Sequence, residues 1–189
     1  MRRALLDAAL QALADRKDIS LRDVARRAGV SHTAPYRHFS DKEALLAAVA
    51  EEGFVAFGEY LRKAKESLEE KPLQALEATG VAYIRYAIEH PTHYRVMFGQ
   101  NLHNCADYPA LLDASTATFE ILVDIIQAGQ TKGAIASGNA RQLALGAWAQ
   151  VHGLAMLLLD GQLPIGEIEA IETLTKQMIQ SSIKGLLSS

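Results

Sequence analysis

The chain has 189 residues, of which 49% are hydrophobic and 22% charged, and its formal net charge at pH 7 is −3. This is the composition of an ordinary globular protein with its own core, and it excludes a disordered, low-complexity or collagen-like chain. The charge is unevenly spread, because residues 1–50 hold nine Lys and Arg against six Asp and Glu, whereas the remainder holds ten against sixteen. A basic N-terminal quarter on an acidic body is the asymmetry expected when one end of a protein meets phosphates.

The cysteine content and the hydropathy of the sequence indicate the cellular compartment of the protein. The single cysteine, Cys105, excludes an intramolecular disulfide and suits a reducing cytosol. The first residues read as an amphipathic helix and not as a signal peptide. The one long apolar run, residues 142–159, carries no formal charge but contains Gln142, Gln150 and His152. We interpret it as a helix buried in a protein interface and not as a membrane span, and we expect a cytoplasmic protein.

Apolar residues recur with helical spacing along the chain, and no β-type alternation of convincing length is present. The sequence therefore predicts an all-α fold of about nine helices, over residues 3–15, 21–28, 32–39, 41–66, 72–89, 92–99, 109–132, 140–160 and 167–187. Pro72 fits a first helical turn, where its missing N–H costs nothing, and Pro91 ends the preceding helix. We place the domain boundary inside the fourth helix, which gives domains of residues 1–46 and 47–189.

Residues 20–43 form the most informative segment. Ser20 and Asp23 match a capping box, in which the two side chains satisfy the first amides of a helix, and Ser40 and Glu43 repeat that pattern. Gly29 is placed to end the first of these helices in the left-handed conformation. A helix, a short glycine turn and a second helix make the helix-turn-helix layout, whose second helix enters the major groove of DNA. The segment thus predicts DNA as a partner.

The second helix carries side chains that suit DNA. Near its start and on its outward face, Thr33 and Arg37 are suited to base edges. Tyr36 and His38 carry donors for phosphate oxygens. Lys42 lies in the first turn of the following helix, where a helix N-terminus already favours an anion. With cations of the preceding helix, the predicted DNA-binding residues are Arg26, Arg27, His32, Thr33, Ala34, Tyr36, Arg37, His38 and Lys42.

Two linked patterns stand out here, Ala25-x-x-x-Gly29-Val30-Ser31 and Tyr36-x-His38-Phe39-x-x-Lys42-Glu43-x-Leu45. Together they resemble the TetR (tetracycline repressor) family of bacterial transcriptional regulators, and the close match covers about residues 20–46. The resemblance implies that Thr33, Tyr36, His38 and Lys42 contact DNA. The chain departs from the family in residues 15–19, which lack the usual aromatic and glycine, and at Pro35, which we expect to stiffen the second helix.

The rest of the chain predicts a dimer and an effector site. Small or polar residues recur along the eighth helix and would let another helix approach closely: Gln142, Gly146, Gln150 and Gly153. Two such helices from each subunit would form a four-helix bundle, and the resemblance implies a homodimer through the last two helices. Trp148-x-x-x-His152-Gly153 resembles a Trp-His-Gly variant of the family, in which the eighth helix lines an effector cavity. The predicted effector-binding residues are Tyr83, Tyr86, Met97, Phe98, Asn101, His103, Phe119, Trp148, His152 and Met156.

Metal and enzyme sites are not predicted. His90, His93, His103 and Cys105 lie close in sequence, but their spacing matches no standard zinc pattern, and no catalytic motif is present, so we expect no enzyme, metal or cofactor. We predict a ligand-responsive transcriptional regulator, a repressor released from a palindromic operator by a small organic effector. The alternatives are a co-repressor-dependent or metal- or redox-sensing regulator of the same fold, and a helical interaction protein without DNA affinity.

Overall fold

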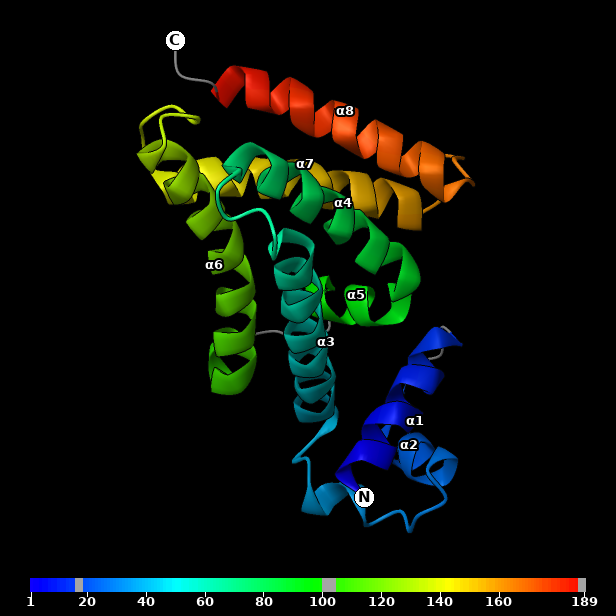
Figure 1. The fold of residues 1–189 in the computed structure, drawn as a ribbon. Helices are drawn as coiled ribbons and strands as arrows, with labels where there is room; N and C mark the ends of the chain where they lie inside the picture. Colours follow the sequence, from blue (N-terminus) through cyan, green and yellow to red (C-terminus); the bar gives the residue numbers. More distant parts are fainter. Residues whose placement is uncertain (16–18, 100–104, 187–189) are drawn as a thin grey trace. The chain divides into compact units, whose positions relative to one another are not determined.

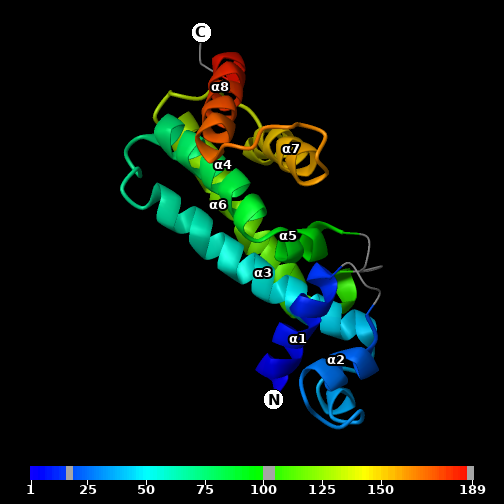
Figure 2. The same cartoon turned by 90° about the vertical axis from the view of Figure 1, so that its right-hand side faces the viewer.

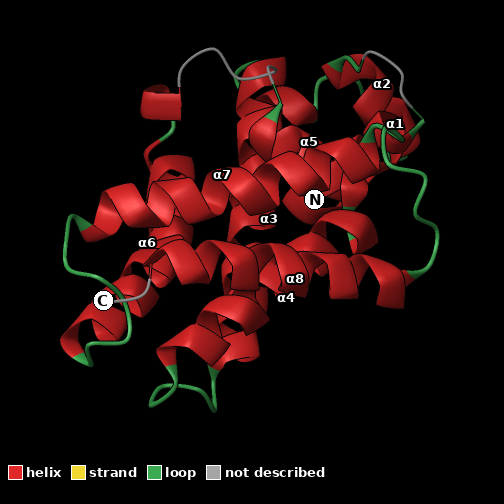
Figure 3. Cartoon of the chain, turned by 90° about the horizontal axis from the view of Figure 1, so that it is seen from above, coloured by secondary structure: helices red, strands yellow, loops and turns green. Residues whose placement is uncertain are grey.

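The computed structural model describes residues 1–15, 19–99 and 105–186 (Figure 1). Over these residues the chain forms eight α-helices and two short 3-10 turns, and helices are joined by loops with no strand among them (Figure 3). The predicted all-α fold is confirmed. Each of the eight α-helices begins and ends within one residue of a predicted helix, and only the predicted helix over residues 32–39 is replaced by a shorter turn.

The chain divides into two compact units that are not contiguous in sequence. One contains Met1–Ala56 and His90–Ser115, and the other contains Phe57–Glu89 and Thr116–Ser189. Helices α3 (Lys42–Lys65) and α6 (Pro109–Thr131) each contribute residues to both units. The predicted domain boundary at residue 46 also falls in α3, closer to its start than the division after Ala56.

The first unit is built around α1 (Arg2–Ala14), α2 (Leu21–Arg27), the first half of α3 and α5 (Pro91–Phe98). Its core contains aliphatic side chains, of which Leu5, Val24, Leu45 and Val49 are completely excluded from solvent, and the equally buried ring of Tyr94. Helix α1 packs against both α2 and α5. The short turns η1 (Pro35–Arg37) and η2 (Cys105–Asp107) complete this unit.

Helix α5 approaches α3 at a glycine. A Cβ built on Gly53 would lie 2.7 Å from Sδ of Met97, so a larger residue at this position would displace the methionine. One residue along each helix, the rings of Phe54 and Phe98 meet edge to face with centroids 5.3 Å apart. Residues 90–98 are therefore part of the same core as the N-terminal helices.

In the second unit, α4 (Pro72–Glu89) packs against both α7 (Ala140–Leu159) and α8 (Ile168–Leu186), as Figures 1 and 2 show. The α4–α8 approach depends on Gly80, because a Cβ built there would lie 2.1 Å from Cδ1 of Ile179. An ion pair between Arg85 and Glu172 joins the same two helices at the surface. Helix α4 is thus the central helix of this unit.

Helix α7 has an unusual exposure for so apolar a segment. Its N-terminus is capped by Asn139, whose Oδ1 accepts a hydrogen bond from the amide of Gln142 at 3.2 Å. Among the described helices it alone is long and apolar enough to cross a membrane by length and composition, a test that helices of soluble proteins also pass. Only 22% of that apolar window is buried, and Leu145 and Leu157 are 52% and 46% exposed.

Candidate nucleic-acid interface and aromatic cluster

Both ends of α2 are fixed by the local interactions that the sequence predicts. Ser20 Oγ accepts the amide of Asp23 at 3.2 Å and donates to its Oδ2 at 2.6 Å. At the other end Gly29 adopts a φ of 68°, and the amide of Val30 donates to the carbonyl of Ala25 at 3.0 Å. This is the Schellman arrangement, which turns the chain sharply after the helix. The first helix and the turn of the predicted helix-turn-helix are therefore present.

The segment after the turn is tighter than the α-helix predicted over residues 32–39. The amide of Ala34 donates to Ser31 O at 3.0 Å and that of Arg37 to Ala34 O at 3.2 Å, both at three-residue spacing. Pro35 has no N–H, so the four-residue hydrogen bond to the Ser31 carbonyl cannot form, and the segment closes as the 3-10 turn η1. The amide of Phe39 returns to four-residue spacing, with a 2.9 Å bond to Pro35 O.

The side chains predicted to touch DNA are mostly presented to solvent. We define the reader surface as the five exposed residues of this segment: His32, Thr33, Tyr36, Arg37 and His38. Tyr36 is 54% exposed although it is aromatic. Ala34 differs from the other predicted residues, because it is only 6% exposed and lies in the core of the unit. Phe39, also buried, anchors the end of the segment.

Helix α3 begins directly after the reader surface. Its first residue is Lys42, which is half-buried. The cap is Asp41, whose Oδ1 accepts the amide of Ala44 at 2.8 Å, and Ser40 Oγ donates to the other carboxylate oxygen at 3.1 Å. The cap therefore lies one residue later than the predicted Ser40 capping box, because the Asp41 side chain reaches the third amide of the helix first.

The two cations predicted on α2 are engaged within the protein. Arg26 Nη2 lies 2.9 Å from Asp23 Oδ1, and Arg27 Nη2 lies 2.5 Å from Asp15 Oδ2. The hydroxyl of Ser20, together with the charges of Arg26 and Arg27, lowers the pKa of the Asp23 carboxyl. Their assignment to DNA binding stays a prediction.

In the second unit, six rings from α3, α4, α6 and α7 form a continuous series of ring contacts. We call them the aromatic cluster: Phe57, Tyr83, Tyr86, Phe119, Trp148 and His152. Phe57 meets Tyr83 and Tyr86 at centroid distances of 4.9 and 4.8 Å. Trp148 lies 5.8 Å from Phe119 and 5.7 Å from His152. Burial raises the pKa of Tyr86 to about 12, so its hydroxyl stays protonated.

A chain of hydrogen bonds runs through this cluster. The indole Nε1–H of Trp148, which can only donate, is 3.1 Å from Tyr83 Oη. The same oxygen is 2.9 Å from Nδ1 of His152. The tyrosine hydroxyl satisfies both neighbours when it accepts from the indole and donates to Nδ1, which places the imidazole proton on Nε2. Burial lowers the pKa of His152, in agreement with a neutral ring.

The predicted effector residues are not all brought together. Tyr83, Tyr86, Phe119, Trp148 and His152 form most of the aromatic cluster. Met156 is half-buried further along α7, whereas Met97 and Phe98 lie in the first unit beside α3. Asn101 and His103 lie outside the described residues. Phe57, which also belongs to the cluster, was not among the predicted effector residues, although its helical spacing to Tyr60 and Leu61 marks the inner face of α3.

The metal hypothesis gains no geometric support. Among the residues that the structure describes, no group of three or more His, Cys, Asp and Glu side chains is placed to hold an ion. His103 lies outside these residues, and Cys105 falls in η2. The Nε2 atom of His93 is buried and has no hydrogen-bond partner among the described residues, and burial together with the charges of His90 and Arg3 lowers the pKa of this histidine.

Comparison with known proteins links both units to one family. The family model of tetR-family bacterial regulatory proteins matches residues 5–49, and that of a tetracyclin repressor-like C-terminal domain matches residues 76–181. The chain belongs to the tetR family. The tetR family consists of transcriptional regulators and not of enzymes, as the sequence predicted. The Trp-His-Gly subtype stays a prediction.

Relatives of this tetR-family protein extend over its whole length. A structure of a protein of unknown function from Rhodococcus sp. RHA1 is 34% identical, with a TM-score of 0.82, over 99% of this chain and 95% of that one. A TetR-family regulator from Marinobacter aquaeolei shares the fold at 20% identity, with a TM-score of 0.70, over 96% of this chain and 94% of that one. An uncharacterized HTH-type transcriptional regulator from Haemophilus influenzae is 39% identical over 71 residues, which are 36% of this chain and 35% of that protein.

Proposed function

We propose that this tetR-family protein is a cytoplasmic homodimeric repressor that binds a palindromic operator through the reader surface and is released by a small organic effector. The observation that supports it most directly is the reader surface itself. Five polar side chains are exposed on a short segment that a capped helix and a Schellman turn hold in place, inside the region matched by the N-terminal family model.

The chemistry of the reader surface suggests a division of roles. Thr33 and Arg37 are suited to base edges, Arg37 through a bidentate contact to guanine. Tyr36 and His38 are suited to phosphate oxygens, which fix the register on the duplex without reading its sequence. Lys42 would add a cation at the start of α3, beside the same backbone.

A second copy of the chain is the proposed partner of α7. The exposed positions of this helix include Gln142, Leu145, Gly146 and Ala149, which form one stripe at helical spacing. A Cβ built on Gly146 or on Gly153 would meet no atom within 4 Å, so these glycines serve no close packing within the protomer. An uncharged stripe in which small residues lie beside a leucine is suited to close helix packing across a two-fold axis. Two readers about 34–36 Å apart would then meet successive major grooves.

The aromatic cluster is the proposed effector site. It combines apolar ring faces with a few polar groups, which is the usual composition of sites for organic ligands. An effector that prefers one conformation of the protein shifts the equilibrium toward it, with a coupling free energy of typically about 1–3 kcal/mol. Helix α3 is the candidate transmitter, because its backbone runs from the reader surface to Phe57 of the cluster.

Fluorescence anisotropy with labelled palindromes from the region around the protein's own gene tests the DNA-binding function. The wild-type protein should bind one of them saturably at near-physiological salt and in excess random duplex. Replacing both Tyr36 and Lys42 with Ala should weaken this binding by at least tenfold, because each removes a contact to the backbone. Unchanged affinity in that variant, or binding fully displaced by random DNA, would contradict the proposed operator function.

A further inference from the structure

The arginines of the N-terminal region fall into two classes. Six lie in the described part of residues 1–40, and they come from α1, α2 and η1: Arg2, Arg3, Arg22, Arg26, Arg27 and Arg37. All six side chains belong to exposed residues, so exposure does not separate them. What separates them is whether a carboxylate already neutralises the guanidinium.

Three of the six are paired with acids of the same unit. Arg3 lies 2.5 Å from Asp7 and 2.9 Å from Glu52, so it links α1 to α3. Arg26 pairs with Asp23, which the Ser20 cap holds in position, and Arg27 pairs with Asp15 beyond the end of α1. The two charges of each pair largely cancel at the distance of a phosphate.

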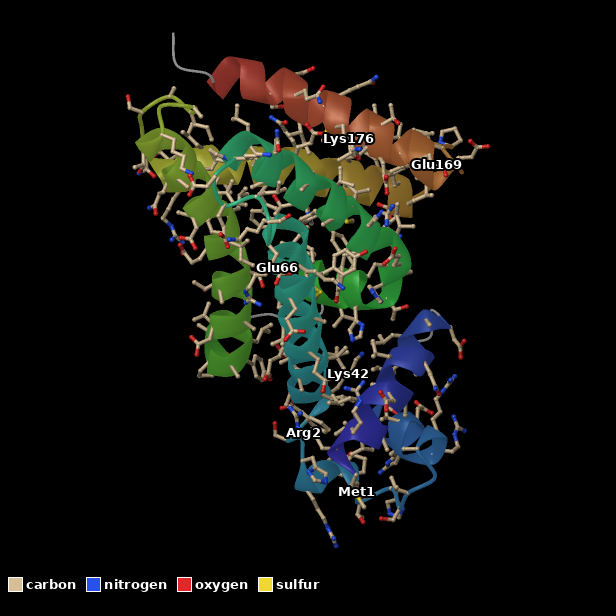
Figure 4. The ribbon with its side chains drawn as sticks, viewed as in Figure 1. Met1, Arg2, Lys42, Glu66, Glu169 and Lys176 are labelled. Carbon is tan, nitrogen blue, oxygen red and sulfur yellow. The ribbon has the colours of Figure 1, made fainter. Side chains whose placement is uncertain are left out.

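The other three make no ion pair with any residue that the structure describes. Arg37 belongs to the reader surface. Arg2 extends from α1 over the ring of Phe39, with its Cζ 5.8 Å from the ring centroid, and it lies beside the segment that leads into Lys42 (Figure 4). The cation–π contact thereby holds a charge beside Phe39, the residue that follows His38 at the end of the reader surface.

The pattern of buried residues in α2 places Arg22 on the exposed face of that helix. The buried positions of this helix are Leu21, Val24 and Ala25, so Arg22 and Arg26 share the solvent face one turn apart. In helix-turn-helix proteins the first helix crosses the DNA backbone while the second enters the groove. Of the two α2 arginines on this face, Arg22 is the one with no acidic partner among the residues that the structure describes.

We propose that Arg2 and Arg22, outside the reader surface, are the arginines through which this protein neutralises DNA phosphates, whereas Arg3, Arg26 and Arg27 hold the unit together. This inference rests on the proposed DNA-binding function and refines its contact set. Each phosphate neutralised releases condensed counterions and contributes about −0.9 to the slope of log Kobs against log salt concentration. In a homodimer each arginine acts twice and should contribute about −1.8.

The test is the salt dependence of DNA binding for six single Arg→Gln variants, from about 50 to 200 mM salt. Each variant removes the same charge, and the chain supplies matched pairs: Arg2 against its neighbour Arg3, and Arg22 against Arg26 on one helix face. The slope should become shallower by about 1.8 for R2Q and R22Q, and should remain near wild type for R3Q, R26Q and R27Q. R37Q, at the position assigned to base edges, should instead lower the preference for the palindrome over random DNA. Thermal unfolding followed by circular dichroism checks that each variant is folded at the assay temperature.

Measuring the slopes on both a palindrome and a random duplex separates the two proposals, because the phosphate contribution is also present in non-specific binding. If the protein shows no preference for the palindrome over random DNA, the proposed operator function is wrong. The slopes on random DNA still test the proposed division of the arginines. Equal slope changes within the matched pairs would overturn the division, and so would failure of the wild-type protein to bind any duplex at the lowest salt.

Discussion

The hydrogen-bonded side chains of Tyr83, Trp148 and His152 can report on one another's protonation state. Trp148 is the only tryptophan of the chain, and its ring centroid lies 5.7 Å from that of His152. A charge that appears on the imidazole is therefore expected to alter the emission of a single, known fluorophore. Because Tyr83 donates to Nδ1, protonation of His152 must also reverse that hydrogen bond.

We predict that Trp148 fluorescence titrates with a midpoint below pH 6.5, the ordinary value for histidine. Burial lowers the pKa of His152, so the folded protein binds a proton less readily at this site than the unfolded chain does. Its contribution to stability is therefore present above about pH 6.5 and is lost as the pH falls through the lower folded pKa. Emission of the wild-type protein, followed from pH 8 to pH 5, measures the midpoint.

The matched variant is His152→Gln, which keeps polar hydrogen-bonding capacity near Tyr83 but cannot titrate. Its emission should stay flat across the same range. A midpoint above 6.5 in the wild-type protein would contradict the neutral assignment of the ring. A transition that persists in the variant would show that another group is being observed.

The sequence identified several of these residues singly, but not as partners. Spacing placed Trp148 and His152 on one face of a helix. Tyr83 lies 65 residues before Trp148, and no local pattern reports that α4 packs on α7. For the same reason Met97 and Phe98 were grouped with the effector residues, although their contacts are with the first unit. Long-range packing, and not residue chemistry, was the missing information.

At the scale of elements, single glycines determine how closely helices pack. Gly80 on α4 brings the backbone against Ile179 of α8, a side chain that is only 5% exposed. Val151 of α7 lies near the same position, 3.6 Å from a built Cβ. A side chain at residue 80 would therefore push on both neighbours of the central helix.

We predict that Gly80→Ala and Ile179→Val are coupled. Alanine at residue 80 meets Cδ1 of Ile179 at 2.1 Å, and valine lacks that carbon. Ile179→Val alone should cost about 0.5–1.5 kcal/mol of unfolding free energy, but in the Gly80→Ala background its cost should vanish or reverse. Urea denaturation of the four proteins gives the double-mutant cycle. Additive effects would show that α8 is not in contact with α4 at Gly80.

Helix limits were predictable because they depend on nearest neighbours. The Ser20 cap, the Gly29 turn and the first turn at Pro72 each depend on a few adjacent residues, and the structure confirms all three. The predicted helix around Pro35 was wrong in extent because the proline was expected only to stiffen that helix. With its N–H missing, the preceding residues use the shorter 3-10 spacing instead.

At the scale of the whole molecule, α7 is apolar and yet exposed. Leu145 is 52% exposed, far more than a leucine in the middle of a long helix requires. The proposed homodimer would cover this stripe, which accounts for the exposure. Without that cover, the protomer would present an uncharged apolar surface to solvent, and such surfaces promote association.

We predict that Leu145→Arg converts the protein from a dimer to a monomer. An arginine buried without a partner at an interface costs about 3–5 kcal/mol, which corresponds to a loss of affinity of at least about 100-fold. Sedimentation velocity at micromolar concentration measures the oligomeric state. The control is Val55→Arg, at a residue of α3 with similar exposure, 49%, which should remain dimeric. A dimeric Leu145→Arg protein would exclude α7 from the interface.

The discontinuous first unit bears on how such proteins are recombined. Residues 5–49 carry the N-terminal family match, but Gly53 and Phe54 lie beyond it, and their packing partners Met97 and Phe98 come more than forty residues later. A chimera joined at the end of the matched region would combine the reader surface of one protein with helix α5 of another. Exchange of DNA specificity between relatives should therefore succeed only when the segment His90–Ser115 is transferred together with the N-terminal region. During synthesis, likewise, the core of the first unit cannot be completed until that segment has left the ribosome.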